Sequence, residues 1–256
     1  MGCPFVGATF FSSQNCGKVS RVVMMLLLLL FFSLLRVSGE VRYFSSAAVG
    51  VVSLKNPEIA YYRYSGQIYT FQLGIYYRLT PYLFGYAGME YTRASPAPKL
   101  IHPEYYDFHK LDFLYQNVTS LLYCEPLALR RTKIALNMGA EMGQANFDKK
   151  FKSKFYDEVV ESQAGYFVGR MTSGLMTDYF FNENMVTGIK IQLSPISLAY
   201  FSKNTVLNFW SSHSLVFHLR HNWKETAVEM FYENKLTTFP YRLVIHQFGV
   251  NILWKL

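Results

Sequence analysis

The sequence predicts an all-β protein, a transmembrane antiparallel up-and-down β-barrel of about ten strands, with eight strands as the alternative. Three observations support this prediction. The 256 residues are 51% hydrophobic and 18% aromatic but only 16% charged, whereas an ordinary soluble domain is about 25% charged. No apolar run reaches the length of about 20 residues that a membrane-spanning helix needs. Apolar and polar residues instead alternate with a period of two, as strands with two different faces require.

The composition also excludes several classes of protein. Intrinsic disorder requires few aromatic residues and a high charge. Three cysteines in a chain of this length cannot form the framework of a disulfide scaffold. The formal net charge of +8 is dispersed along the chain rather than gathered in a basic patch. We therefore expect no nucleic-acid partner.

The N-terminal segment has the features of a secretory signal. Its apolar run, Val22–Leu35, is 14 residues long, which suits a signal better than a membrane span. Lys18 and Arg21 precede the run, and the first acidic residue of the chain is Glu40. Small residues follow the run and predict cleavage after residue 39. The alternative is an uncleaved anchor helix.

Two regions follow from this interpretation. Residues 1–39 form a cleaved signal peptide, and residues 40–256 form the barrel. The mature chain keeps a single cysteine, Cys124, and has 22 basic against 17 acidic residues.

Ten strands are expected in the mature chain. The clearest alternation covers residues 67–79, 131–143, 185–194, 215–220 and 248–256. Over residues 67–79, for example, the apolar side chains from Tyr69 to Leu79 occupy every second position.

Five weaker candidates fill the intervals between these strands. They cover residues 41–53, 83–93, 110–124, 163–177 and 226–235, and two of them, 110–124 and 163–177, alternate poorly.

The connections between the expected strands alternate in length. The short ones cover residues 80–82, 125–126, 178–184 and 222–225, and the longer ones cover about 54–65, 94–109, 144–162 and 195–206. Short turns at one end and long loops at the other are typical of a meander whose ends face different compartments. We expect both termini to face the periplasm and the long loops to face the outside.

The residue types favour a membrane barrel over a soluble one. The polar faces carry Gly, Gln, Asn, Thr and single charges of both signs, whereas the apolar faces combine large aromatic and aliphatic residues. A membrane barrel turns its apolar face outward, and only a closed barrel satisfies the backbone of strands in a bilayer. The residues then expected to face the lumen are Arg78, Glu90, Arg131, Lys133, Glu141, Lys190, His218, Arg220 and Glu229.

The tryptophans predict an aromatic girdle at the two membrane interfaces. Trp210 and Trp223 bracket one expected strand. Thirteen steps of about 3.3 Å, tilted by about 40°, project to roughly 33 Å, which is close to the thickness of a bilayer. Trp254 is expected at the same interface as Trp223, where indole rings are enriched.

The C-terminal strand completes a resemblance to the small bacterial outer-membrane β-barrel proteins. In that group the last strand carries apolar or aromatic residues at every second position, and the assembly machinery reads it. The chain ends in this way, although its last residue is leucine where an aromatic is usual. The resemblance is architectural, covers residues 40–256 and points to the outer membrane protein W-like and opacity-protein-like groups. The matching residues are Phe248, Val250, Ile252, Trp254 and Leu256.

Few residues suggest enzymatic chemistry. His213 and Ser214 are adjacent and lie on opposite faces of a strand, so they cannot form a dyad without a bulge. Asp107 and His109 share a face near a loop, but no partner carboxylate pair accompanies them. We assign no catalytic, cofactor-binding or metal-binding residues and expect no enzyme.

One polar pair is expected inside the lumen. If Trp223 and Lys224 formed a turn, His218 would lie opposite Glu229 and could share a hydrogen bond with it.

The inward charges leave two interpretations open. They could neutralise one another in a narrow, filled lumen, or line a small, slightly anion-preferring water path. The first hypothesis is therefore porin-like passage of small solutes or a largely closed structural barrel. The alternatives are a surface adhesin that binds host molecules and a lipid- or peptide-modifying enzyme. The adhesin would use the basic loop at 149–154 and the Pro-rich loop at 95–103.

Overall fold

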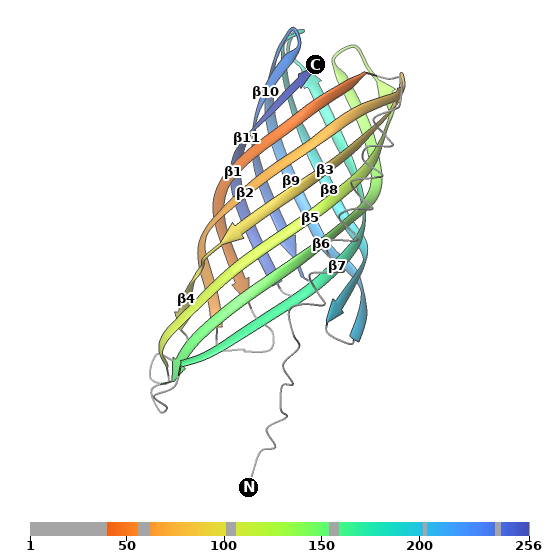
Figure 1. Ribbon diagram of the computed structural model, residues 1–256. Helices are drawn as coiled ribbons and strands as arrows, with labels where there is room; N and C mark the ends of the chain where they lie inside the picture. The colour runs from red at the N-terminus through yellow and green to blue at the C-terminus, as the bar shows by residue number, and fades with distance from the viewer. Residues whose placement is uncertain are drawn as a thin grey trace. The chain divides into compact units, whose positions relative to one another are not determined.

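The computed structural model describes residues 40–55, 62–100, 106–153, 159–201, 204–238 and 242–255. These residues form a closed antiparallel β-barrel of ten strands, which confirms the predicted fold class (Figure 1). Among them, no helix is long and apolar enough to cross a membrane. The expected signal peptide at 1–39 lies outside the described residues.

Every strand pairs with its neighbours in chain order, and β1 pairs with both β2 and β11 to close the barrel. Two elements, β3 and β4, act as one interrupted strand because both pair with β2. The elements are β1 (Val41–Lys55), β2 (Tyr62–Thr80), β3 (Leu83–Ala94), β4 (Ala97–Leu100), β5 (Tyr106–Ala128), β6 (Thr132–Ser153), β7 (Val159–Phe180), β8 (Met185–Phe201), β9 (Asn204–Trp223), β10 (Thr226–Thr237) and β11 (Arg242–Lys255).

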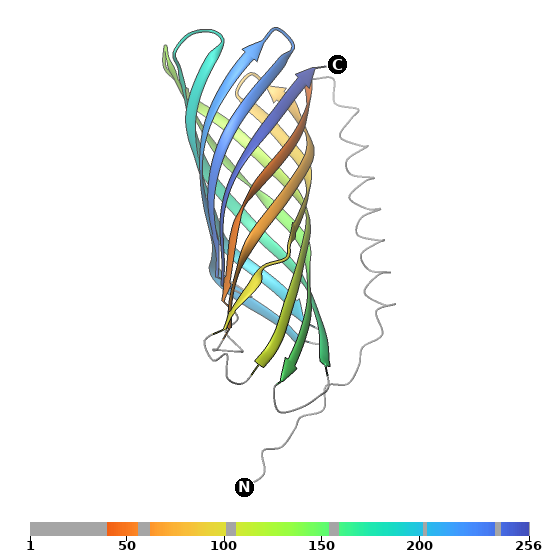
Figure 2. The same cartoon turned by 90° about the vertical axis from the view of Figure 1, so that its left-hand side faces the viewer.

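The two ends of the barrel differ. The connections β2–β3, β5–β6, β7–β8 and β9–β10 are short and lie at the end where β1 starts and β11 finishes, as Figure 2 shows. We call this the turn end and the opposite one the loop end.

The strands are longer than the sequence pattern indicates. Several stretches expected to be loops are strand: the basic residues up to Ser153 belong to β6, and residues 97–100 of the Pro-rich stretch form β4. The 22 residues of β6 span roughly 73 Å at about 3.3 Å per residue, well beyond a hydrocarbon core of about 30 Å. Polar residues near the strand ends were therefore mistaken for loop residues, although their backbones continue the ladder.

The two faces of β6 exchange polarity along the strand. Towards the turn end, Met138 points outward with 61% of its surface exposed, and Glu141 points inward and is buried. Towards the loop end, Asp148 is exposed while Phe147 is buried inside the barrel. The apolar face thus changes from outside to inside near residue 143.

The same exchange occurs on β2. Phe71 and Leu73 are each 62% exposed on the outside, and Gln72 points inward beside them. Nearer the loop end, Gln67 is exposed and Ile68 is fully buried. We therefore distinguish a turn-end half, with a polar interior, from a loop-end half, with an apolar interior.

An apolar plug fills the loop-end half. Its aromatic rings pack closely, with the centroids of Phe113 and Phe147 4.9 Å apart and those of Phe147 and Tyr166 5.8 Å apart. The plug consists of Val52, Leu54, Tyr64, Ile68, Ala94, Leu111, Phe113, Tyr115, Ala145, Phe147, Tyr166, Val168, Ala199 and Ile245.

A bulge on β9 reverses its phase at Trp210. Strict alternation would place Trp210 and Trp223, an odd number of residues apart, on opposite faces. Ser211 and Ser212 are both buried, Trp210 has a φ of 55°, and the register with β8 shifts at this point. Because a bulge inserts an extra residue, Trp210 and Trp223 both face outward, 66% and 57% exposed.

Candidate functional site

The turn-end half encloses a cavity of about 720 Å³. Its lining extends from turn residues such as Pro81 and Lys224 to Glu90 and Glu141 in the middle of the barrel. Beyond these lies a much smaller space of about 30 Å³, whose lining includes the plug residue Phe113. The large cavity therefore reaches the turn end and stops at the plug.

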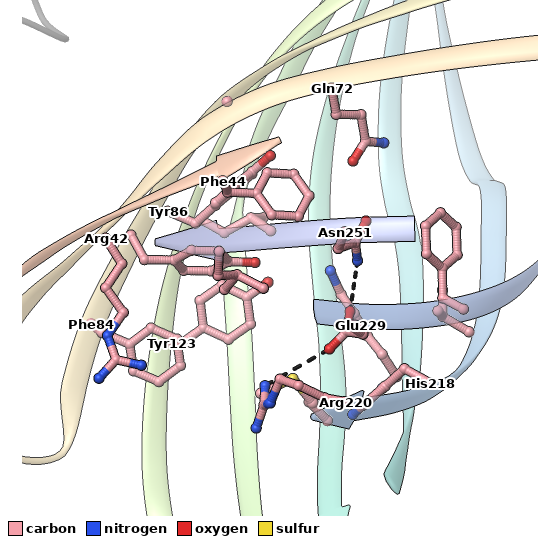
Figure 3. Close-up of a pocket in the computed structure, with 18 of the residues that line it drawn as sticks. Arg42, Phe44, Gln72, Phe84, Tyr86, Tyr123, His218, Arg220, Glu229 and Asn251 are labelled. Carbon is pink, nitrogen blue, oxygen red and sulfur yellow. Dashed lines mark hydrogen bonds and ion pairs between the residues drawn. The ribbon is translucent and has the colours of Figure 1, made fainter. Parts of the chain in front are cut away.

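One side of the cavity is an aromatic wall, where Figure 3 shows Phe44, Phe84, Tyr86 and Tyr123 from β1, β3 and β5. Tyr76 from β2 packs against these rings and belongs to the same wall. The rings of Phe84 and Tyr123 stack with centroids 4.7 Å apart and an interplanar angle of 5°. The rings of Tyr76 and Tyr86 lie 4.8 Å apart. Each of these aromatic residues is an even number of positions away from the inward-pointing polar residues of its strand. It therefore points inward as well.

The opposite side is a polar wall from β7, β9, β10 and β11. His218 Nε2 and Arg220 Nη2 each lie 3.0 Å from a carboxylate oxygen of Asp178. Arg220 Nη1 also lies 3.8 Å from Glu229, which accepts a 2.6 Å hydrogen bond from Asn251. Burial makes such pairing necessary, because an unpaired charge in this setting is costly.

A buried ion pair separates the cavity from the plug. Arg170 Nη1 donates to Glu141 Oε1 at 2.7 Å and to the Tyr115 hydroxyl at 2.9 Å. Tyr115 in turn donates to Glu141. Both charged side chains are nearly inaccessible, with 5% of Arg170 and 10% of Glu141 exposed. This pair forms the inner end of the site.

Lys133 and Lys190 are among the lining lysines that have no carboxylate partner within 4.0 Å among the described residues. Lys133 Nζ lies 5.4 Å from the ring centre of Phe180, and Lys190 Nζ lies 5.8 Å from that of Tyr123. Such distances allow cation–π attraction. Lys190 thus extends from β8 towards the aromatic wall.

The charges around the cavity balance. Eight carboxylates face eight lysine or arginine side chains. The acidic residues are Glu40, Glu90, Glu125, Glu141, Asp178, Glu225, Glu229 and Glu233, and the basic ones are Arg42, Arg78, Lys133, Lys190, Arg220, Lys224, Lys235 and Lys255.

The structure brings most of the expected lumen residues to this cavity. Arg131 is the exception, because it lies in the β5–β6 turn, is exposed and is absent from the lining. The expected residues in the lining are Arg78, Glu90, Lys133, Glu141, Lys190, His218, Arg220 and Glu229.

The expected pairing of His218 with Glu229 is wrong. The β9–β10 turn is formed by Lys224 and Glu225, not by Trp223 and Lys224, so Glu229 lies opposite Arg220. Lys224 has a φ of 33°, in the positive range that tight hairpin turns require. His218 contacts Asp178 instead.

The candidate catalytic residues do not converge. His213 is exposed outside the barrel and Ser214 is buried inside it. Asp107 and His109 belong to β5, but their side chains lie outside the described part of the chain. Within the described ranges, no group of three or more His, Cys, Asp or Glu residues could hold a metal ion.

Sequence reasoning missed Asp178, Arg170 and Tyr115. Asp178 was expected in a turn, whereas β7 continues to Phe180. Arg170 and Tyr115 lie on the two strands that alternate poorly. Their hydrophobic patterns are blurred because apolar residues lie on both faces of each strand. The one feature of the sequence that could have indicated this site was Arg170, a single arginine among apolar residues.

Of the three tryptophans, Trp223 and Trp254 lie near the turn end. Trp254 is opposite Thr226 at the start of β10 and stacks on Tyr43, with centroids 6.2 Å apart. Trp210 lies towards the loop end of the same strand as Trp223.

No protein-family model and no curated protein matches this sequence. Among solved structures, the translocator domain of autotransporter NalP from Neisseria meningitidis aligns with a TM-score of 0.53, at 8% identity over 95% of this chain and 98% of that chain. The beta domain of the Bordetella autotransporter BrkA aligns with a TM-score of 0.51, at 7% identity over 85% of this chain and all of that domain. The chain therefore has the fold of outer-membrane β-barrels.

Proposed function

We propose that the protein is an integral β-barrel of the bacterial outer membrane that is closed to solutes. The apolar plug is the observation that carries this proposal. It occupies the barrel interior at the loop end, and several of its members, including Tyr64, Ile68 and Leu111, have no exposed surface.

The outer surface supports membrane insertion. Large apolar side chains cover the turn-end half, among them Phe71, Met138 and Phe248, which are 62%, 61% and 66% exposed. Soluble monomers rarely expose continuous apolar surface of more than a few hundred Å². Lipid would cover this surface, and the closed ladder leaves no strand edge unpaired in the bilayer.

Closure distinguishes this proposal from porin-like passage. A conducting barrel needs a continuous water-filled path, whereas the cavity here ends at the Arg170–Glu141 pair and the plug. A ten-stranded barrel is narrow enough for its own side chains to fill it. Passage of solutes would therefore require the plug to leave.

The proposal extends to assembly and subfamily. The last strand points Phe248, Val250 and Ile252 outward and pairs with β1 at the closing seam. This arrangement supports recognition of β11 by the outer-membrane assembly machinery. Membership of the outer membrane protein W-like or opacity-protein-like groups belongs to the same proposal.

Planar-bilayer recording tests closure. We expect the purified protein to give no conductance steps. A variant that truncates three plug rings, Phe113→Ala, Phe147→Ala and Tyr166→Ala, should conduct if it folds. A matched control truncates the outward-facing Phe71, Phe217 and Phe248 to alanine and should remain closed. Steady conductance of the unmodified protein would contradict the proposal.

A surface-interaction role is the second candidate, and the exterior of the loop-end half favours it. Asp148, Lys150 and Glu161 are exposed there, and Lys150 Nζ lies 2.7 Å from Glu161 Oε1. Because the proposed bilayer covers the turn-end half, the exterior of the loop-end half would lie in water. Binding of cells to host surface molecules should fall when these three residues are replaced by serine, and unchanged binding would remove this candidate.

The proposal includes no enzymatic activity. The buried His218–Asp178 pair is a possible general base, but Arg220 occupies the second oxygen of Asp178. Hydrolysis of phospholipid or peptide substrates that is lost on His218→Gln substitution would contradict this part of the proposal.

A further inference from the structure

We propose that the turn-end cavity is a binding site for a neutral saccharide of one or two rings. A closed barrel has no need of such a site, so the inference goes beyond the proposed function. It rests on the size of the cavity, its aromatic wall, its neutral polar lining and its balanced charge.

The cavity has the dimensions of a small-molecule site. Its volume of about 720 Å³ falls within the range of about 300–1,000 Å³ that is usual for ligand pockets. It reaches the turn end and is closed at its inner end, so a ligand could enter from one side only. Its walls are strands of a closed hydrogen-bonded ladder, which makes the site preformed.

The aromatic wall supplies an apolar surface for a ring. Figure 3 shows Phe84, Tyr86 and Tyr123 together on one side of the cavity, facing Arg220 and Glu229 on the other. A sugar ring presents C–H groups on its faces and hydroxyls around its edge. Its faces can pack on aromatic rings, which bury large areas and have a polar tip in tyrosine.

Neutral polar side chains in the lining point to a ligand rich in hydroxyl groups. Amides and hydroxyls line the cavity, among them those of Gln72, Thr119, Gln192 and Asn222. A hydroxyl both donates and accepts, so a sugar can satisfy acceptors and donors alike.

The charge balance selects a neutral ligand. Eight acidic and eight basic side chains line the cavity, so an anion or a cation would meet repulsion as well as attraction. Many of these charges are already engaged, for example in the Asp178–Arg220–Glu229 chain. A neutral sugar instead uses the remaining donors and acceptors of the amides, hydroxyls and carboxylates.

Saturation-transfer NMR and titration calorimetry of the full mature chain test the inference. The protein is held in a detergent without a sugar headgroup, because glycoside detergents would compete. The probes are maltose and N,N′-diacetylchitobiose, with glucuronate and phenylalanine as charged and zwitterionic comparisons. We expect one neutral disaccharide to bind more tightly than either comparison probe.

Two variants test whether the disaccharide binds in this cavity. Phe84→Leu removes a ring from the aromatic wall and should weaken binding about tenfold, the effect expected when an aromatic contact is lost. Thr119→Val removes a hydroxyl of the lining while keeping the side-chain shape and should weaken binding by roughly three- to tenfold. Phe71→Leu makes the same chemical change as the first variant on the outside of the barrel and should leave the affinity unchanged.

Several outcomes would overturn the inference. One is that neither disaccharide binds with a Kd below about 10 mM. Others are tighter binding of a charged probe, or equal affinity in the unmodified protein and both cavity variants. If Phe84→Leu fails to fold, Thr119→Val decides, because valine keeps the shape of threonine. These readouts are independent of conductance, so a failure here and a failure of the closed-barrel proposal are distinguishable.

Discussion

The two halves of β6 differ in the polarity of their faces, and β2 shows the same difference. In the turn-end half, Leu136 and Met138 face outward and Glu141 faces inward. In the loop-end half of the same strand, Asp148 is exposed outside and Phe147 is buried inside. A single strand can therefore be inside-out in one half and arranged like a soluble barrel in the other, because its two halves meet different solvents.

The boundary between the halves coincides with a buried ion pair. Arg170 and Glu141 lie where the polar cavity ends and the apolar plug begins. Their position isolates the plug from the water that enters at the turn end. The comparison of the halves can be tested by changes at this boundary and on each side of it.

The largest effect is expected from breaking the boundary pair. Glu141→Ala leaves Arg170 buried without its carboxylate, and we expect the free energy of unfolding to fall by about 3–5 kcal/mol. Urea titration of the protein in lipid vesicles measures this loss.

A double variant sharpens the result. Replacing both residues by methionine removes both charges, and we expect stability close to that of the unmodified barrel. If the double variant were as unstable as Glu141→Ala alone, burial of an unpaired charge would not be the cause.

The next largest effect tests the outer face of β6. Met138→Arg places a charge on the turn-end exterior, where lipid is proposed, and should cost about 2–4 kcal/mol of unfolding free energy. Asn146→Arg makes a similar change on the same face of the same strand, in the loop-end half, and should change stability by less than about 0.5 kcal/mol. Equal costs in vesicles would mean that the two halves share one environment.

A smaller effect is expected in the polar wall. Asp178→Asn removes the charge that His218 and Arg220 share. We expect a loss of about 1.5–3 kcal/mol, the range for a hydrogen bond to a charged group, with Glu229 still available to Arg220. The control is Asp148→Asn on the exterior, which should be neutral. A stable Asp178→Asn barrel would show that the polar wall is not held by this carboxylate.

The smallest effect on stability is expected from Glu40, at the entrance of the cavity. A hydrogen bond from Arg42 and the attraction of its charge lower the pKa of Glu40 below 4.5. The folded pKa is therefore below the unfolded one, so the contribution is present at neutral pH and is lost as the pH falls through the folded pKa.

Unfolding of the Glu40→Gln variant at a series of pH values checks the sign. The exposed setting keeps the expected loss below about 1 kcal/mol at pH 7, and the difference from the unmodified protein should vanish in acid. A difference that grows in acid would contradict this assignment.

Alternation divided the residues of each clear strand between two faces, and the residue types indicated which face points outward. The phases of residues 67–79, 131–143 and 248–256 follow from period-two patterning, since successive side chains on a strand point to opposite faces. The strand number, the meander order and the inward position of Lys190 and Arg220 could all be predicted in this way. These properties depend only on the alternation of side chains along a strand, which is a local property of the backbone at every position.

The tertiary structure alone decided what lies inside each half. Alternation does not reveal whether an apolar face meets lipid or a plug, because both environments favour the same residues. The partners of His218 also depended on register, and the two-residue turn at Lys224 and Glu225 fixed it. Asp178 and Arg220 lie on β7 and β9, which both pair with β8, so they meet only when these three strands are in register.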